Sequence, residues 1–397
     1  MDTTENSGRL IASTLARFTG AFGRAPEAAA YAPGRIEVLG NHTDYNEGLV
    51  LSAAIDLGIA FAAARRPDRL CRIVSGNMGR ETSFGLDGIA PSTAEPWSNY
   101  SRGVLAGLAA IAPIPSGFDA VVMGDIPTGS GLSSSAALEV CTGLALAGLY
   151  DIAVDRLQMA RICQAAEHGF AGVKCGLLDQ VSSLFGAPGC LVSTDFRTLE
   201  VRTKPLGADA CFLMCDTLEK HALVDGEYNQ RRAACEAAAA AFAKILPHPV
   251  TALRDVSWEE WQAHHAEIDP MAARRAAHPI GETRRVADGI RMLEAGDLVG
   301  FGRLMFESHA SSRDYFENSS RKLDIAVDAA RKIPGILGAR LSGGGFGGSA
   351  VMLVQPRSAA TAMAALASAF RHEAGHDCEV RIVRPGPGAS LVDIPAG

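Results

Sequence analysis

The chain has 397 residues, more than one hydrophobic core normally organises, so we expect two lobes. Hydrophobic residues make up 48% and charged residues 20% of the chain, which is the balance of a globular protein and excludes a disordered one. The formal net charge of −7 argues against a protein that coats nucleic acid, but it leaves room for a local site that binds a small anion.

Apolar runs and helical spacing place alternating strands and helices in the first half of the chain. In chain order, the predicted elements are strands over 48–55 and 58–66, a helix over 98–111, a strand over 118–123, a long apolar helix that follows the segment rich in glycine and serine at 124–137, and a helix over 157–170. The two early strands lie around Asp56-Leu57-Gly58.

The second half predicts strands and helices in the same mixture. They are strands in the 190s and over 207–217, a helix over 229–246, a polar helical region up to 331, a strand with a glycine loop, a strand over 350–354, a helix over 359–372 and a strand over 378–383. The regular βαβ rhythm of a doubly wound sheet is missing, so we expect an α+β protein. We place the boundary between the lobes near residue 200, giving lobes 1–200 and 201–397.

Nine cysteines are spread along the chain without CxxC spacing, which predicts reduced thiols rather than a disulfide framework or a zinc site. The first ten residues are polar and acidic, so we expect no secretory signal peptide. The most apolar stretch, 53–64, is too short to span a bilayer. We therefore expect a cytoplasmic protein that binds neither membrane nor nucleic acid, and that is a monomer or a weak dimer.

The segment Gly124-Asp-Ile-Pro-Thr-Gly-Ser-Gly-Leu-Ser-Ser-Ser-Ala-Ala137 is the most informative. Gly129 and Gly131 let the backbone approach a ligand closely, and three serines follow at the start of a helix, where free N–H groups attract anions. These features indicate a phosphate cradle, although no Walker GK[ST] is present. A degenerate dinucleotide turn and a serine-capped helix without a ligand are the alternatives.

Two further segments carry candidate site residues. The stretch 341–350 has five glycines in six positions, which predicts either a flexible hairpin or a loop packed against a ligand or against the first cradle. The stretch 32–46 gathers Arg35, His42, Asp44 and Tyr45 into one predicted loop. Such side chains suit the binding of sugar hydroxyls, and a polar surface turn is the alternative.

Taken together, these segments resemble the GHMP family of small-molecule kinases, and within it the galactokinases. The segment 35–46 is similar to the signature PGR-x-x-x-hydrophobic-GEHTDYN, 127–137 to the ATP loop, and 341–348 to the third family motif. The segments 166–180 and 227–236 also resemble galactokinase blocks, in the same order along the chain. The resemblance covers nearly the whole sequence.

The resemblance implies a two-lobed GHMP kinase fold, with a ribosomal-S5-like N-terminal lobe and a ferredoxin-like C-terminal lobe. It also implies ATP-dependent phosphorylation of the anomeric hydroxyl of a sugar, with Mg²⁺. The implied catalytic residues are Asp179 and Arg35, and Mg²⁺ is expected on Ser134 and Glu167. The implied ATP-binding residues are Trp97, Gly129, Ser130, Gly131, Leu132, Ser133, Ser134, Ser135 and Ala136. The implied sugar-binding residues are Asn41, His42, Asp44, Tyr45, Gly176 and Tyr228.

The chain departs from the family pattern at Asn41, where the signature has a glutamate associated with the 6-hydroxyl of the hexose. An amide adds two donors and removes a negative charge, so the substrate is expected to be galactose or a C6 variant such as galacturonate. The block 319–324 departs as well. The alternatives are a sensor that binds sugar and ATP without turnover, a GHMP kinase for a non-sugar alcohol, and a dinucleotide-dependent oxidoreductase.

Overall fold

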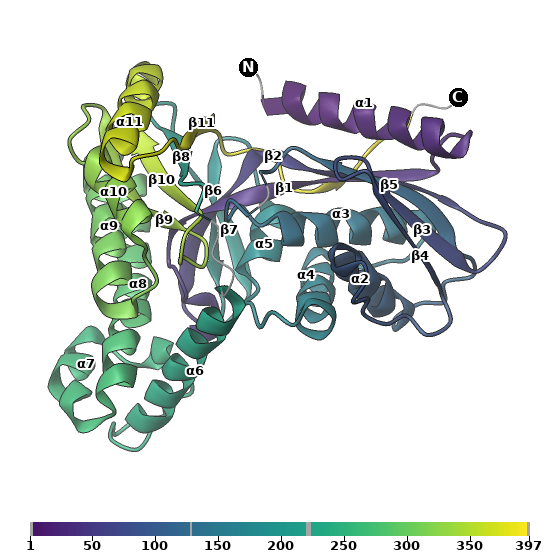
Figure 1. Ribbon diagram of the computed structural model, residues 1–397. Coiled ribbons are helices and arrows are strands. Elements are labelled where there is room, and N and C mark those ends of the chain that lie inside the picture. Colours follow the sequence, from purple (N-terminus) through teal and green to yellow (C-terminus); the bar gives the residue numbers. More distant parts are fainter. Residues whose placement is uncertain (1–2, 128, 220–223, 395–397) are drawn as a thin grey trace.

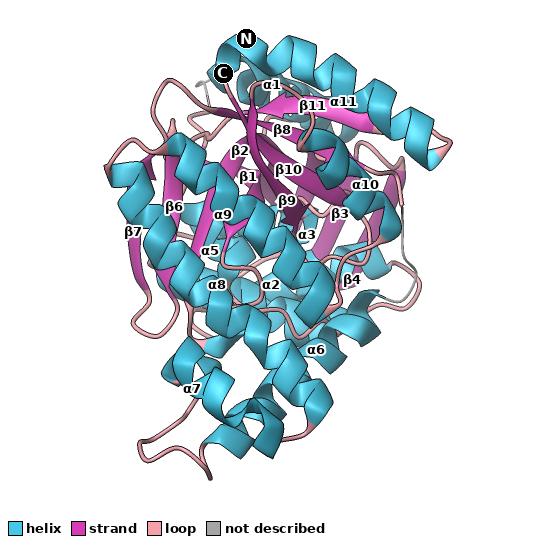
Figure 2. Cartoon of the chain, turned by 90° about the vertical axis from the view of Figure 1, so that its left-hand side faces the viewer, coloured by secondary structure: helices cyan, strands magenta, loops and turns pink. Residues whose placement is uncertain are grey.

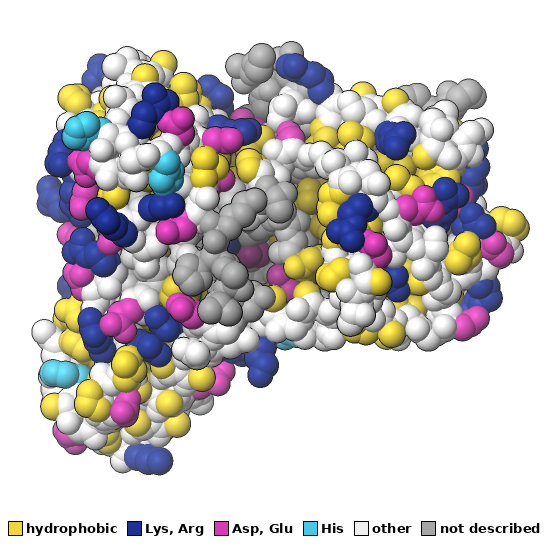
Figure 3. Space-filling model, viewed as in Figure 1, with side chains coloured by type: hydrophobic (Ala, Val, Ile, Leu, Met, Phe, Trp, Pro, Cys, Tyr) yellow, Lys and Arg dark blue, Asp and Glu magenta, His cyan; other side chains and the backbone are white. Residues whose placement is uncertain are grey.

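The computed structural model describes residues 3–127, 129–219 and 224–394. Within these residues the strands form two sheets, and helices cover their faces (Figure 1). Among the described residues, no helix has both the length and the apolar character that crossing a bilayer requires. Acidic and basic side chains are intermingled over the face of the molecule shown in Figure 3.

The larger sheet is mostly antiparallel and has the order β12-β1-β2-β5-β3-β4, with β6 paired to β2 and β7 paired to β6. Its strands are β1 (Ala28–Leu39), β2 (Leu49–Arg65), β3 (Leu70–Ser75), β4 (Arg80–Gly85), β5 (Phe118–Gly124), β6 (Cys190–Asp195), β7 (Glu200–Pro205) and β12 (Ser390–Leu391). Only the pairing of β3 with β5 is parallel among the described strands.

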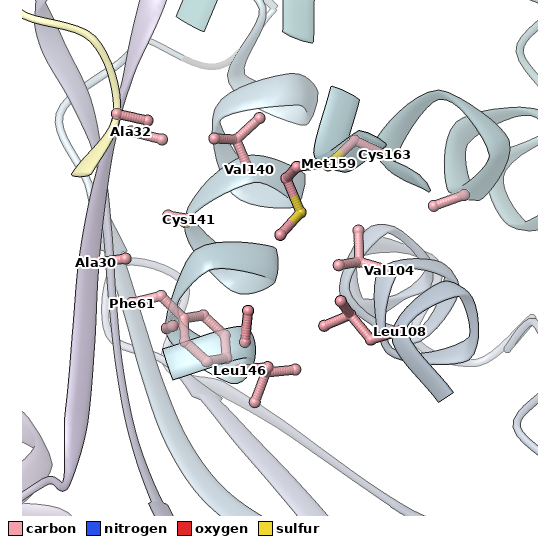
Figure 4. Packing of buried hydrophobic residues seen from close by; sticks show 14 of the residues in the cluster. Ala30, Ala32, Phe61, Val104, Leu108, Val140, Cys141, Leu146, Met159 and Cys163 are labelled. Carbon is pink, nitrogen blue, oxygen red and sulfur yellow. The ribbon is translucent and has the colours of Figure 1, made fainter. Parts of the chain in front are cut away.

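Helices cover both faces of the larger sheet. Helix α1 (Thr3–Phe22) packs on one face through a small cluster around the fully buried Phe18. The other face holds the main core, formed with α2 (Asn99–Ala109), α3 (Ser134–Leu149), α4 (Arg156–Ala166) and α5 (Leu178–Phe185). In Figure 4, α3 lies between the strands that carry Ala30 and Ala32 and the helices that carry Val104 and Met159.

The smaller sheet is antiparallel, with the order β11-β8-β10-β9. Its strands are β8 (Cys211–Asp216), β9 (Ile336–Ser342), β10 (Ser349–Val354) and β11 (Glu379–Val383). One face packs against α10 (Arg321–Ala330) and α11 (Ala359–Ala374). Side chains of the opposite face, such as Phe212 and Val351, share a core with β1, β2 and α9 (Leu298–Ser311), so this core joins the two sheets.

A helical region extends beyond both sheets, at the bottom of Figure 2. It consists of α6 (Val224–Phe242), α7 (Trp258–His264) and the long α8 (Pro270–Glu294), which pack around their own apolar cluster. Helix α8 continues toward the larger sheet, because Val286 on it belongs to the core that joins the sheets. It therefore connects the helical region with the strands that carry the predicted site.

Most of the predicted elements are confirmed, including the helices now labelled α2, α3, α4 and α11 and the strands β5 and β10. Two predictions are wrong. The residues 49–65 form one long strand, β2, rather than two. The stretch 32–46 is not one loop, because β1 runs to Leu39 and carries Arg35. The boundary at residue 200 stays a prediction, since β7 and β12 both pair within the larger sheet.

Candidate active site

A cavity of about 160 Å³ opens where the larger sheet, α5, α6 and the loop between β9 and β10 meet. Eight of the residues predicted for the site line it: Arg35, Asn41, His42, Asp44, Glu167, Gly176, Asp179 and Tyr228. Glu37, Val173, Cys175, Leu178, Gly343 and Gly344 complete the lining. The structure thus brings together residues that are more than 300 positions apart in the sequence, and four carboxylates line the wall.

The predicted catalytic pair is in direct contact. The Arg35 guanidinium on β1 donates to Asp179 Oδ1 from Nε at 2.9 Å and lies 2.7 Å from it through Nη2. Asp179, in the first turn of α5, accepts a hydrogen bond from Ser133 Oγ at its other oxygen, 2.5 Å away. Arg35 Nη1 also donates to the carbonyl of Gly131 at 2.7 Å. One cation therefore connects the acidic residue with the predicted phosphate cradle.

The segment 129–136 has the backbone of an anion site. Gly131 has a φ of +74°, a conformation that a side chain would strain. Ser133, the residue before α3, also lies in the left-handed region with a φ of 57°, and its side chain does not cap the helix. The N–H groups of the first turn of α3 are therefore left uncapped by this side chain, as an anion-binding helix start requires.

The glycine-rich loop between β9 and β10 packs against this cradle. Of the two alternatives predicted for it, the packed loop is therefore confirmed rather than the flexible hairpin. A Cβ added to Gly343 would lie 2.9 Å from the Gly131 carbonyl oxygen, closer than real side chains approach. Ser349 Oγ donates to the carbonyl of Ser130 at 2.6 Å. The glycines of this loop are therefore needed for close contact between the two lobes beside the cavity.

Asp44 contributes a second carboxylate to the cavity wall, beside that of Asp179, and it packs directly against Gly176. Asp44 Oδ1 accepts from the N–H of Tyr45 at 2.9 Å, and Oδ2 accepts from the N–H of Leu178 at 3.4 Å. A Cβ on Gly176 would stand only 1.6 Å from Asp44 Oδ2. Burial, reinforced by the charge of Asp179, raises the pKa of Asp44 to about 6.

His42, Tyr45 and Tyr228 form an aromatic cluster beside Asp44, with ring centroids 5.1 to 5.8 Å apart. The Gly344 carbonyl can only accept, so His42 Nε2 donates to it at 3.3 Å, and Nδ1 accepts from the Tyr45 hydroxyl at 2.8 Å. Burial lowers the pKa of His42 to about 3, which keeps the ring neutral. Both ring nitrogens of His42 thus have partners within the protein. His42 and Tyr228 line the cavity, whereas the predicted Tyr45 lies behind them and contacts His42.

The amide of Asn41 is almost fully buried, and its donors and its acceptor are all hydrogen-bonded within the protein. Its Nδ2 donates to Glu37 Oε2 at 2.7 Å and to the Gly343 carbonyl at 2.9 Å, and its Oδ1 accepts from Asn318 at 3.1 Å. The two donors that were expected to meet a substrate carboxylate are therefore already used. Glu37, which sequence reasoning missed, follows Arg35 at the strand spacing of two, a signal that becomes readable once residues 28–39 are known to form a strand.

The predicted metal ligands lie next to the catalytic pair. Among the described residues, no group of three or more His, Cys, Asp or Glu side chains is arranged to hold a metal ion. Glu167 is buried, and its Oε2 accepts from Cys175 Sγ at 3.1 Å and Gln180 Nε2 at 3.0 Å. The hydroxyl that hydrogen-bonds to Glu167 is that of Ser135, next to the predicted Ser134. This oxygen set fits Mg²⁺, which needs one or two carboxylates beside phosphate oxygens.

Trp97 lies in a short 3₁₀ turn, Pro96–Ser98, that precedes α2. Its ring packs partly buried against the main core, and its Nε1 donates to Glu95 Oε2 at 2.5 Å. The side chain is therefore fixed by the protein itself. Its predicted place beside an adenine ring stays a prediction.

Three family models match the chain. They are described as the galactokinase galactose-binding signature, over residues 16–65, the GHMP kinases N terminal domain, over 99–187, and the GHMP kinases C terminal, over 290–372. These matches contain the signature loop, the cradle and the glycine-rich loop of the site.

Full-length relatives are similar as well. The chain is 38% identical to the galactokinase of Chloroflexus aurantiacus, over 96% of this chain and 98% of that one, and 40% identical to that of Homo sapiens, over 89% and 90%. The galactokinase of Lactococcus lactis complexed with galactose superposes with a TM-score of 0.90 at 33% identity, covering 95% of this chain and 98% of that one. The mevalonate kinase of Methanococcus jannaschii, at 17% identity and a TM-score of 0.62, covers 90% and 98% and shares the fold.

Proposed function

The chain belongs to the GHMP kinase family and, within it, to the galactokinases, so we propose that it transfers the terminal phosphoryl group of ATP to the anomeric hydroxyl of galactose, giving galactose 1-phosphate and ADP. Its two-lobed α+β fold is that of the family, and the protein is a sugar kinase. The observation that carries the proposal is the contact of Asp179 with both Arg35 and Ser133, at the point where the polar cavity meets the anion cradle.

In the proposed reaction, Asp179 holds the anomeric hydroxyl and accepts its proton. The bonds from Arg35 and Ser133 fix the orientation of its carboxylate before substrate binds. Phosphoryl transfer proceeds through a loose transition state, so orienting the hydroxyl contributes alongside the basicity of Asp179. Arg35 supplies a positive charge beside the phosphoryl group, where negative charge must be stabilised.

The cradle 129–136 and the start of α3 would receive the phosphates of ATP through backbone N–H groups and the helix dipole. Glu167, with the neighbouring hydroxyls of Ser134 and Ser135, would hold Mg²⁺ beside them. When bound, this ion neutralises charge on the phosphates. Trp97 is proposed to lie next to the adenine.

Galactose, rather than galacturonate, is the substrate that the cavity favours. The Asn41 amide has no free N–H for a substrate carboxylate, and the carboxylates of Glu37, Asp44 and Asp179 all line the wall. The carboxylate of galacturonate would be repelled by these groups, whereas the neutral hydroxyls of galactose can donate hydrogen bonds to them. The sugar-binding roles of His42, Tyr45, Gly176 and Tyr228 are part of the same proposal.

The test is ADP release from MgATP on addition of galactose, measured for the purified protein with a panel of aldoses and uronic acids. We expect turnover with galactose that exceeds turnover with galacturonate. Binding of both ligands without ADP release would instead identify a sensor. Turnover with only a non-sugar alcohol would assign another GHMP substrate.

The Asp179→Asn variant tests the assignment of the catalytic residue. An amide still contacts the hydroxyl but cannot take its proton, so kcat should fall about 10²–10⁴-fold while calorimetric binding of galactose changes little. A variant with nearly wild-type turnover would show that Asp179 is not the catalytic acid–base residue.

A further inference from the structure

Glu37 is a buried carboxylate on the cavity wall that takes no part in the proposed phosphoryl transfer. It is 3% exposed and lies on β1, where Arg35 and Glu37 pair regularly with Ala54 and Ser52 of β2. Side chains two apart on a strand point the same way. Arg35 and Glu37 therefore face the cavity, whereas Ile36 between them enters the core that joins the sheets.

The hydrogen bonds to this carboxylate all reach the same oxygen. Oε2 accepts from Asn41 Nδ2 at 2.7 Å and from the Gly343 N–H at 3.2 Å, and in the described part of the chain no bond to Oε1 is present. The backbone N–H of Glu37 donates to Ser342 Oγ at 2.9 Å. The carboxylate is therefore held in place through Oε2, and Oε1 keeps its acceptor capacity.

The surroundings act on the charge of this carboxylate in opposite directions, and it is ionised above neutral pH. Burial raises the pKa of Glu37 to about 7, but the nearby cations Arg340 and Arg35 act in the opposite direction. Arg340 is fully buried, and its Nη1 lies 3.5 Å from Glu282. A buried carboxylate gains most when a further donor reaches it, because burial has removed its water.

We propose that Glu37 determines sugar specificity: its Oε1 accepts a hydrogen bond from a neutral sugar hydroxyl, and its charge rejects sugars that carry a carboxylate. Asn41 is then a positioning residue, which acts through Glu37 and not on the sugar. This inference rests on the proposed function. It places on residue 37 the acidic group that the sequence pattern led us to expect at residue 41.

The position of Glu37 on β1 separates it from the reacting hydroxyl. Arg35 contacts Asp179, which marks the reacting hydroxyl, and Glu37 lies two residues further along the strand, about 7 Å away. That distance places its partner on a different carbon of the ring. The contact is therefore one of recognition, and its loss should appear in KM more than in kcat.

The test combines the variant Glu37→Gln with galactose and its monodeoxy analogues at each non-anomeric carbon. In the wild type, one analogue should lose about 10- to 100-fold in kcat/KM, as expected for a hydrogen bond to a charged group. In Glu37→Gln the same analogue should lose less than about tenfold relative to galactose, while the penalties of the other analogues stay unchanged. At pH 8, where Glu37 is ionised in the wild type, the ratio of kcat/KM for galactose to kcat/KM for galacturonate should be about tenfold or more smaller in Glu37→Gln than in the wild type.

If each analogue loses as much in Glu37→Gln as in the wild type, and the preference for galactose over galacturonate is unchanged, the inference is overturned. The KM for ATP and the circular dichroism spectrum serve as controls for the fold. If Glu37→Gln does not fold, Glu37→Asp replaces it: the shorter acid should lose the single hydroxyl contact but still reject galacturonate, and an unchanged analogue profile would overturn the inference. Failure of the proposed function is distinct, because the wild type itself would then not phosphorylate galactose.

Discussion

At position 176 the site requires the absence of a side chain. Gly176 precedes α5 and touches the carboxylate of Asp44, whose oxygens are held by the N–H groups of Tyr45 and Leu178. An added Cβ would occupy the place of Oδ2 at 1.6 Å, which is within the radius of that atom. Asp44 would have to rotate away, and both of its backbone hydrogen bonds would be disturbed.

We therefore predict that Gly176→Ala raises the KM for galactose about 10- to 100-fold, the value of one hydrogen bond to a charged group, with a smaller effect on the KM for ATP. Gly169→Ala is the matched control, because a Cβ there meets nothing within 4 Å. Steady-state kinetics of both variants check the prediction. Equal KM values for galactose in the two variants would contradict the contact of Asp44 with the sugar.

Two of the proposed sugar acceptors titrate near neutral pH. Burial raises the pKa of Glu37 to about 7, against the opposing charges of Arg340 and Arg35, and burial with the neighbouring Asp179 raises that of Asp44 to about 6. Both groups are ionised above these values and take up protons as the pH falls through them. A neutral carboxyl accepts a weaker hydrogen bond than a carboxylate does.

The KM for galactose should therefore rise as the pH falls from 8 to about 5.5, because Glu37 takes up a proton first and Asp44 second, and each protonation weakens a hydrogen bond to the sugar. Initial rates at saturating MgATP over this range measure the effect. In Glu37→Gln the upper part of the rise, around pH 7, should disappear. A KM that does not change with pH would show that these carboxylates bind the sugar equally well in both protonation states.

The sequence indicates which residues gather at the candidate site where these lie in contiguous motifs, and their roles stay predictions. Asp179, Arg35 and the segment 129–136 belong to such motifs, and the structure brings them together. The hydrogen-bond partners of Asn41 could not be predicted in this way. Its two donors are used by Glu37 and by Gly343, which is some 300 residues distant, and only the folded chain shows that contact.

At the scale of elements, the sequence predicts most helices and strands but places a break in β2. Asp56 and Gly58 look like turn residues, yet the strand continues through them. Gly58 is there for close packing, because a Cβ would lie 2.5 Å from the hydroxyl of Tyr31 on β1. Its N–H donates to Asp125 at 2.7 Å. Helix α1 and strand β1 are not predicted from the sequence, since every residue of β1 is buried and no alternation is visible.

The crossing of α2 and α4 depends on Gly103. A Cβ at this position would lie 2.6 Å from the Cβ and 2.8 Å from the Cα of Ala166, the last residue of α4. The Cα belongs to the backbone and cannot rotate away, so the helices would have to separate. Glu167, the proposed Mg²⁺ ligand, follows Ala166 directly, so the crossing also supports the site.

We predict that Gly103→Ala lowers the thermal stability, because overpacking costs about 1–3 kcal/mol and exceeds the gain of about 1 kcal/mol in helix propensity. Gly20→Ala in α1 is the control: a Cβ there meets nothing within 4 Å, so the propensity gain should raise the stability. Thermal unfolding followed by circular dichroism measures both shifts. Shifts of the same sign would contradict the tight crossing.

At the scale of the whole molecule, α8 connects the helical region to the signature loop through Glu282. This fully buried carboxylate accepts the backbone N–H groups of Gly40 at 2.8 Å and Asn41 at 3.2 Å. Burial alone would raise the pKa of Glu282, but the charges of Arg285 and Arg340 help to hold it well below its usual range. The loop that carries the proposed sugar-binding residues is thus attached to a charge network in the C-terminal half.

The Glu282→Gln variant tests whether this buried network contributes more to the free energy of unfolding than an ion pair at the surface does. The amide keeps the shape and one acceptor, but it removes the carboxylate that pairs with the fully buried Arg340. We therefore expect a loss of about 3–5 kcal/mol of unfolding free energy and a higher KM for galactose. Glu294→Gln at the end of the same helix is the control. Glu294 pairs with Lys204 at the surface, where its side chain is 57% exposed, so its loss should cost at most about 1 kcal/mol.

Denaturant unfolding compares the two variants, and equal stabilities would mean that Glu282 contributes no more than a surface pair. A destabilised Glu282→Gln that kept the wild-type KM would show instead that the network supports the fold without positioning the signature loop.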